Sequence, residues 1–464
     1  MPLTYAPGVS SSPAQGEAGA PGPQYQEHVN PQWVRLLDAL EMNVRYVKCA
    51  GVELHAADGR RFLDFLSGYC VHNTGHNHPA IVSALQRELD RQGPAMLQSH
   101  VSELAGELAE RLCRLTGGRL NKVFFCSSGS EGVEAAIKFA RAHTGRNGLV
   151  YASGAFHGLT CGALSLMDDP FWRAGFGPLL ADTQAVPFGD LAALESALGS
   201  RKIAAFIVEP VQSEAGICLP PAGYLEAAQA ACRKYGTLLV LDEVQTGMFR
   251  TGRFLASHHY GLDPDIVILA KALSGGLVPS GAVLISNNIY DSVYSSLKRA
   301  IVHTSTFSEN NLAMRAGLAT LDVLERENLG ERATNMGDVL RKRLREAVSG
   351  YEMVQEIRGI GLLNGIVFTA PRKLRLRAPF EAFRKIHPAM FGQLVVMRLF
   401  RDHGILTQIC GNNFMVLKAA PPLIVDEGQI DEFVGAMTAV ADLMHTSASF
   451  WTEALGLARR VVNF

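Results

Sequence analysis

Residues Thr237–Ser274 read TLLVLDEVQTGMFRTGRFLASHHYGLDPDIVILAKALS, and this stretch holds two short apolar runs that each lead into one ionisable residue. Leu238–Leu241 precedes Asp242, and Ile266–Ala270 precedes Lys271. Short apolar runs of this kind are typical of strands that are buried on both faces of a parallel sheet. Because ligands bind at the carboxyl ends of such strands, we expect Asp242 and Lys271 to emerge beside the same crevice.

A carboxylate and an amine at adjacent strand ends suit a chemistry in which a pyridine nitrogen is held protonated and a carbonyl is captured as an imine. This is the chemistry of pyridoxal phosphate, with lysine as the Schiff-base nucleophile. Each residue alone also has an ordinary explanation. A lysine after a strand is usually a solvated loop residue, and an aspartate that closes an apolar run is often a helix N-cap or a turn residue.

The length of 464 residues predicts one large domain and a smaller one. Hydrophobic residues make up 48% and charged residues 19%, as in ordinary soluble globular proteins. The net charge of −1 gives no indication of nucleic acid or an anionic membrane as a partner. No uncharged apolar run approaches the roughly 18 residues that are needed to cross a bilayer.

The eight cysteines are scattered, without a C-x-x-C pair, and most lie in apolar stretches. This usage predicts buried thiols in a reducing compartment and no disulfide or metal site. Residues 1–25 are rich in Pro, Gly, Ala and Ser and contain no Lys or Arg, unlike a secretion signal or a transit peptide. We therefore expect a disordered tail over residues 1–28 and a cytoplasmic protein.

The segment Lys122–Arg141, KVFFCSSGSEGVEAAIKFAR, predicts an apolar strand that runs into an amphipathic helix. Ser128 and Glu131 have the spacing of a capping box. Unpaired N–H groups and the positive end of the helix dipole make such a helix start a ready anion site, although a capped helix that binds nothing is an equal alternative. The chain has no G-x-G-x-x-G or Walker pattern, which disfavours a dinucleotide or a P-loop nucleotide.

Other patterns extend this alternation of strands and helices. Val52–Phe65 predicts a hairpin around an Asp-Gly turn, and Leu66–Pro79 a polar loop. Strands are predicted at Leu149–Ala152, Ile203–Val208 and Ala282–Ile285. Strand–helix alternation over about 200 residues predicts an open, mostly parallel α/β sheet.

The sequence changes character near residue 340, where short strands begin to alternate with helices in an α+β pattern. We therefore predict an N-terminal segment over 29–75 that joins the small domain, a large domain over 76–340, and a small C-terminal domain over 341–464.

Six segments, taken in order, resemble the signature segments of the class III aminotransferases. They are SSGSEGVEAAIKFAR, GAFHG, VEPVQSEAG, LDEVQTGMFRTG, ILAKALSGG and HTSTFSENNLA. The resemblance covers roughly residues 30–445, and the ornithine, acetylornithine and putrescine aminotransferases and the ω-amine transaminases look most similar. It implies the fold type I architecture of pyridoxal-phosphate enzymes, a mostly parallel central sheet with helices on both faces plus a smaller α+β domain.

The resemblance also implies roles for residues around the cofactor. Lys271 would form the Schiff base and then move the substrate proton, while Asp242 would keep the pyridine nitrogen protonated. Gln245 would hydrogen-bond the phenolic oxygen. The remaining cofactor residues implied are Ser128, Gly129 and Ser130 at the phosphate, Phe156 stacked on the ring with His157 nearby, Glu209 beside the ring, and Thr306.

Thr306 resembles the residue that reaches the phosphate of the neighbouring subunit, so a homodimer with shared active sites is implied. Tyr69 stands where ornithine-type relatives have a tyrosine that contacts the substrate, and Glu214 matches a glutamate that those relatives use to manage the substrate-binding arginine. Lys418 stands where many relatives carry an arginine for the α-carboxylate, and lysine cannot make arginine's two-pronged contact. The basic and aromatic stretch 369–397 either covers the site and admits a larger or apolar amine, or is a surface insertion.

The resulting hypothesis is an aminotransferase that moves an amino group from an ω-amine donor to a keto acid, such as pyruvate or 2-oxoglutarate, or to an aldehyde. An aminomutase or decarboxylating relative, and a non-catalytic pyridoxal-phosphate-binding protein, are the alternatives. A nicotinamide-dependent oxidoreductase would require a glycine fingerprint that this chain lacks.

Overall fold

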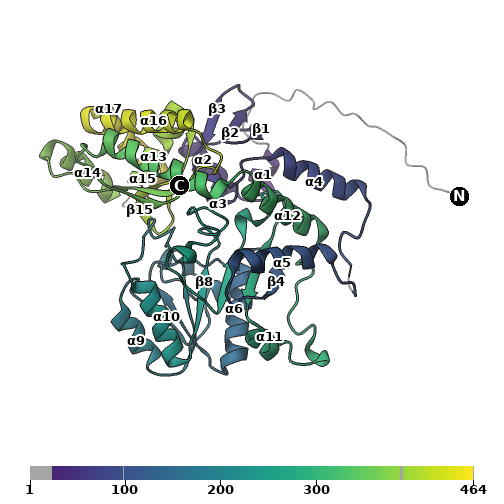
Figure 1. The fold of residues 1–464 in the computed structure, drawn as a ribbon. Helices are drawn as coiled ribbons and strands as arrows, with labels where there is room; N and C mark the ends of the chain where they lie inside the picture. Colours follow the sequence, from purple (N-terminus) through teal and green to yellow (C-terminus); the bar gives the residue numbers. More distant parts are fainter. Residues whose placement is uncertain (1–22, 98, 387–389, 463–464) are drawn as a thin grey trace.

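A seven-stranded sheet forms the centre of the computed structural model, which describes residues 23–97, 99–386 and 390–462 (Figure 1). In spatial order its strands are β4 (Lys122–Cys126), β10 (Gly281–Ile285), β9 (Ile266–Leu269), β8 (Leu238–Asp242), β7 (Ile203–Val208), β5 (Gly148–Ala152) and β6 (Thr183–Val186). Only β10 runs antiparallel to its neighbours in this sheet. The predicted mostly parallel sheet is confirmed.

Helices cover both faces of this sheet because successive strand side chains point in opposite directions. In β8, Leu239 and Leu241 pack into one apolar cluster, and Leu238 and Val240 pack into another. The first cluster includes residues of α5 (Glu103–Thr116), α9 (Leu191–Leu198), α10 (Tyr224–Tyr235) and α12 (Asn311–Arg326). The second includes residues of α6 (Gly129–Thr144) and α11 (Asn287–Val293).

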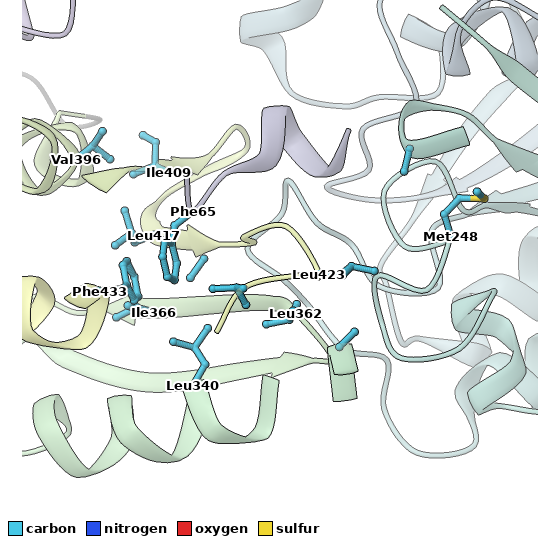
Figure 2. Close-up of a cluster of buried hydrophobic side chains, with 14 of the residues drawn as sticks. Phe65, Met248, Leu340, Leu362, Ile366, Val396, Ile409, Leu417, Leu423 and Phe433 are labelled. Atoms are coloured by element: carbon cyan, nitrogen blue, oxygen red, sulfur yellow. The ribbon is translucent and has the colours of Figure 1, made fainter. Parts of the chain in front are cut away.

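A second sheet is antiparallel and lies in the C-terminal part of the chain. Its order is β11 (Val354–Ile360), β12 (Leu363–Phe368), β15 (Asn413–Ala419) and β14 (Gln408–Cys410). It packs with α13 (Leu329–Val348), α15 (Phe391–His403) and α16 (Glu427–Thr446). Figure 2 shows side chains from these elements in one apolar cluster, among them Leu340, Ile366 and Phe433. The predicted change to an α+β pattern is confirmed in these elements.

The N-terminal strands β1 (Tyr46–Ala50), β2 (Glu53–Ala56) and β3 (Arg61–Asp64) form a third sheet, and the predicted hairpin is confirmed. This sheet is completed by β13 (Ile405–Leu406), which pairs in parallel with β3. Phe65 also stacks on Phe433 of α16, with 4.3 Å between the ring centroids. These contacts support our proposal that residues 29–75 join the small domain, 341–464, beside a large domain over 76–340.

The structure of two segments, one near the N-terminus and one in the C-terminal part, was not determined by the sequence analysis. Pro23–His28 forms the short helix α1, so the end of the predicted tail has regular structure, and residues 1–22 lie outside the described part. Stretch 369–397 contains α14 (Leu374–Ile386), which packs against the C-terminal helix α17 (Ala448–Val462). This stretch therefore lies on the outer side of the small domain, and the described residues favour the surface insertion over the cover of the site, the two alternatives given above.

The remaining described helices are α2 (Pro31–Ala39), α3 (Ser67–Cys70), α4 (Pro79–Asp90), α7 (Cys161–Leu164) and α8 (Pro170–Arg173). The described residues also contain the 3₁₀ turns η1 (Ala256–His259), η2 (Lys271–Ser274) and η3 (Leu297–Arg299). Among the described helices, none combines the length and apolar character that a membrane crossing requires.

Candidate active site

A cavity of about 560 Å³ lies at the carboxyl ends of β8 and β9, and most of the predicted cofactor residues line it. They are Ser128, Gly129, Ser130, Phe156, His157, Glu209, Asp242, Gln245 and Lys271. The cavity volume falls within the range of small-molecule sites. The parallel sheet therefore gathers residues that are separated by more than a hundred positions in the sequence.

Lys271 and Asp242 come from neighbouring parallel strands. Asp242 is the last residue of β8 and pairs in register with Ile268 of β9, and Lys271 follows β9 at the start of η2. Burial lowers the pKa of the Lys271 amine, since it disfavours the charged form, and the carboxylate of Asp242 opposes this shift. The site thus holds an amine that loses its proton more readily than an exposed lysine.

The carboxylate of Asp242 is fixed at both oxygens. Oδ2 lies 2.8 Å from Nδ1 of His157, and Oδ1 accepts a hydrogen bond of 3.0 Å from the backbone N–H of Val244. Burial by itself favours the neutral imidazole, but the hydrogen bond and charge of Asp242, with the charge of Glu209, outweigh it and raise the pKa of His157. The imidazole and the carboxylate therefore hold each other in one orientation.

Glu209 ties the loop that carries Phe156 to the end of β7. Its two oxygens accept hydrogen bonds from the N–H groups of Phe156, at 3.0 Å, and Ser213, at 3.3 Å. Burial raises the pKa of Glu209 to about 7, and the charge of Asp242 adds to this shift, while His157 opposes it. Burial therefore favours the neutral form of this carboxyl group more than in an exposed glutamate.

The start of α6 also lines the cavity. Ser128 is the N-cap and accepts a hydrogen bond from the N–H of Glu131, as predicted. The carboxylate of Glu131 accepts a hydrogen bond from the N–H of Ser127. In a complete capping box the donor would be the N–H of Ser128, the N-cap residue. A Cβ atom on Gly129 would lie 3.0 Å from Val244, so glycine lets the helix start approach the sheet closely.

The polar groups of the cavity fit pyridoxal phosphate. The N–H groups at the start of α6 suit a phosphate, Asp242 suits a protonated pyridine nitrogen, and Lys271 suits an aldehyde carbon. Nε2 of His157 and Oγ of Ser280 are buried in this cavity without a hydrogen-bond partner in the described part of the chain. Buried polar atoms normally have partners, so these two atoms are consistent with a bound polar group.

The three predicted substrate residues form a cluster behind Gln245 and are not among the lining residues of the cavity. The ammonium of Lys418 pairs with the carboxylate of Glu214 and lies 5.0 Å from the centre of the Tyr69 ring. Gln245 joins this cluster to the cavity, because its Nε2 donates a 3.0 Å hydrogen bond to Glu214. Gln245 therefore lines the cavity and also contacts the Glu214–Lys418 ion pair.

Tyr69 is presented by an unusual piece of backbone. Residues Ser67–Cys70 all have positive φ angles, between 53° and 68°. Left-handed turns are costly for residues other than glycine, and such strain is concentrated at functional sites. Asp64 stabilises the turn, since its Oδ1 accepts hydrogen bonds from the N–H groups of Leu66 and Ser67 at 2.8 and 2.7 Å.

Thr306 is exposed and lies away from the lining of the cavity. Sequence reasoning also missed several residues around the site, including Asp64, Val244, Trp172 and Asn412. Val244 could have been found from its place beside Asp242 in the DEVQT segment. Asn412 and Trp172 carry no local signal, because their role depends on contacts between distant parts of the chain.

Comparisons with known proteins agree with this geometry. Residues 37–441 match the family model described as aminotransferase class-III. The chain is 36% identical over 454 residues to "Aminotransferase PigE" of Serratia sp. (strain ATCC 39006), a match that covers 91% of this chain and 53% of that protein. The chain therefore spans about half the length of this curated relative.

Two solved structures show the same likeness. An (S)-enantioselective omega-transaminase from Thermomicrobium roseum has a TM-score of 0.79 and 30% identity, with 91% of this chain and 97% of that chain covered. The ornithine aminotransferase from Toxoplasma gondii ME49 has a TM-score of 0.77 and 30% identity, with 86% and 90% covered. The chain belongs to the class III aminotransferases.

Proposed function

We propose that this protein is an aminotransferase that takes an amino group from an ω-amine donor and passes it to a keto acid or an aldehyde. The observation that carries the proposal is the pairing of Lys271 and Asp242 at adjacent strand ends beside one cavity. The names of similar structures, an omega-transaminase and an ornithine aminotransferase, support donors with a terminal amine.

Pyridoxal phosphate is the cofactor of this family, and when bound it supplies an electron sink for the carbon that bears the amine. In our proposal Lys271 binds it covalently, and Asp242, oriented by His157, keeps a proton on its ring nitrogen. Glu209 positions Phe156 for stacking on the ring. Ser128, Gly129 and Ser130 hold the phosphate at the start of α6, and Gln245 hydrogen-bonds the phenolic oxygen.

Lys271 is also the proposed general acid and base. Its lowered pKa makes the neutral amine accessible, so Nζ can accept a proton from the substrate carbon and then return it. The carboxylate of Asp242 keeps the protonated form within reach, because it opposes the effect of burial. The same nitrogen can therefore serve in both directions of transfer.

We further propose a homodimer in which Thr306 completes the phosphate site of the partner subunit. The exposed position of Thr306 supports this proposal. Large apolar side chains at neighbouring positions in the sequence, Leu297, Ile301 and Phe307, are between 62% and 96% exposed, which is the kind of surface that a partner subunit could cover. A cytoplasmic location stays a prediction from cysteine usage.

The direct test screens amine donors against pyruvate and 2-oxoglutarate and measures the keto-acid-dependent appearance of the new amino acid. Stoichiometric transfer from at least one ω-amine is expected. Absence of transfer over a broad panel would contradict the proposal. Product analysis separates the alternatives, since an aminomutase needs no second keto acid, a decarboxylase releases carbon dioxide, and a non-catalytic protein gives no product.

A further inference from the structure

The loop that follows β5 is held at two successive residues. The N–H of Phe156 donates a 3.0 Å hydrogen bond to Oε1 of Glu209, which directly follows β7. Nδ1 of His157 lies 2.8 Å from Oδ2 of Asp242, the last residue of β8, and both side chains are buried. The loop is therefore anchored to the ends of two central strands.

The next residues of this loop are fixed as well. Gly158 has a φ angle of 123°, and a Cβ atom there would overlap Oγ of Ser130, so only glycine lets the loop press on the start of α6. On the other side of Leu159, the helix α7 is tied to α6, because the N–H of Gly162 donates a 2.7 Å hydrogen bond to Oε1 of Glu134. Leu159 is thus held in place from both sides.

Leu159 lines the cavity, and yet the residue is 53% exposed. Apolar surface is more stable when it is removed from water. A leucine in a mobile loop could fold back onto the protein, but the backbone around Leu159 is anchored at each of the contacts above. Its exposed surface can therefore be covered only by something that enters from outside.

Other apolar residues of the cavity wall are also partly exposed. With Leu159 they form what we call the apolar rim: Val71, Leu159, Leu277, Val278 and Pro279. Among the described residues that line the cavity, the carboxylates and ammonium groups are those of Glu209, Asp242 and Lys271, and our proposed function assigns all three to the cofactor. The hydroxyl of Ser274 is also occupied, since it donates to the carbonyl of Val278. The rim therefore offers apolar surface.

We propose that Leu159 is a specificity-determining residue for the amine donor, and that an alkyl chain on the amine-bearing carbon of the donor lies against the apolar rim. This inference rests on the proposed aminotransferase activity and specifies its substrate class. An alkyl chain covers the rim and loses unfavourable contact with water, whereas a polar group there would lose its water without gaining a partner.

The first test follows chain length. Propylamine, butylamine, pentylamine and hexylamine are offered to the cofactor-loaded enzyme with pyruvate, and the formation of alanine is measured. We expect kcat/KM to rise about two- to fourfold with each added methylene, because each one buries more apolar surface. Equal values over the series, or a fall with length, would overturn the inference.

The same series gives a binding readout that does not depend on turnover. The change in cofactor absorbance on adding each amine yields an apparent Kd, which should fall by about two- to fourfold per methylene. If no amine is turned over, the proposed function has failed, and the Kd series still decides the inference. A Kd that does not depend on chain length would contradict it.

The second test changes the residue. Leu159→Asn keeps a similar size but is polar, so the increment per methylene should drop to less than about 1.5-fold in kcat/KM and in Kd. Leu159→Met stays apolar and should keep the increment. Leu89→Asn is the matched control, since Leu89 is 61% exposed on α4 and is not among the residues that line the cavity.

Two results with Leu159→Asn would overturn the inference. A merely structural role would weaken all four amines by the same factor and leave the increment unchanged. A role in covering by a partner subunit would lower the molecular mass in sedimentation equilibrium, again with an unchanged increment. We expect the mass and the near-ultraviolet circular dichroism of the wild-type enzyme together with a reduced increment.

Discussion

The cofactor side of the cavity and its substrate side are assembled from different parts of the molecule. Lys271 and Asp242 follow adjacent strands of one sheet, and their separation is fixed by the hydrogen bonds between β8 and β9. Glu214 and Lys418 are 204 residues apart and meet because the C-terminal sheet packs against the loop that follows β7. The first arrangement is set within one sheet, and the second depends on the packing of the C-terminal sheet against a distant loop.

The turn between β14 and β15 is a main contact of the substrate side. Nδ2 of Asn412 donates to the carbonyls of Gly154 at 3.0 Å and Ala155 at 3.3 Å, and its backbone N–H donates to the carbonyl of Glu214 at 2.9 Å. This turn therefore connects the small sheet to the loop before Phe156 and to the ion pair. Substitutions on the cofactor side and on the substrate side should therefore show how much each contributes to activity and stability.

The largest effect is expected on the cofactor side. Lys271→Ala should reduce amine transfer by roughly 10²- to 10⁴-fold or more, because the proposed nucleophile and general base are both lost. Borohydride reduction of the loaded wild-type enzyme, followed by peptide mapping, should place the cofactor adduct on Lys271. An adduct on another lysine would contradict the assignment.

On the substrate side, Lys418→Met should lower the free energy of unfolding by about 3–5 kcal/mol, because Glu214 is left buried without a counter-ion. Urea denaturation measures this change. The double variant Glu214→Gln with Lys418→Met should recover most of the loss, since it restores neutrality. If the double variant is as unstable as the single one, the loss comes from packing and not from charge.

A smaller effect is expected at the turn. Asn412→Ala removes the partner of the Trp172 indole and of two carbonyls, at a cost of about 1–3 kcal/mol. KM for the amine should rise more than kcat falls, because Phe156 and Glu214 lose a support. Asn413→Ala is the control, since its side chain makes one such contact across the turn, to the carbonyl of Ala215. Equal effects of both variants would remove the special role of Asn412.

The last prediction concerns the pH dependence of stability. Because the pKa of Glu209 in the folded protein is raised to about 7 from its ordinary value of 4.5, the folded state binds more protons than the unfolded state between these values. The stability that this group contributes is therefore complete below pH 4.5 and is lost as the pH rises through about 7. Glu209→Gln should flatten this part of the profile of the cofactor-free protein, measured by urea denaturation. An unchanged slope would contradict the raised pKa.

Sequence patterns alone were sufficient for the central sheet and for the cofactor side. The apolar runs before Asp242 and Lys271 predict buried parallel strands, and parallel strands bring their carboxyl ends to one edge. The Ser128 cap was predictable for the same reason, since it depends on neighbours only a few residues away. The capping-box spacing implied that the Glu131 carboxylate would accept a hydrogen bond from the N–H of Ser128, but it accepts one from the N–H of Ser127. The spacing could not distinguish the two donors, because both serines precede the helix.

The tertiary structure decided the rest. The left-handed turn that presents Tyr69 is imposed by Asp64 and by contacts with Ala420, and only Gly68 hints at it in the sequence. The placement of α14 on α17, and not over the cavity, follows from apolar contacts such as that of Phe380 with Trp451. Local patterns report which faces of an element are buried. They do not report which distant element buries them, and the Glu214–Lys418 pair exists only through that choice.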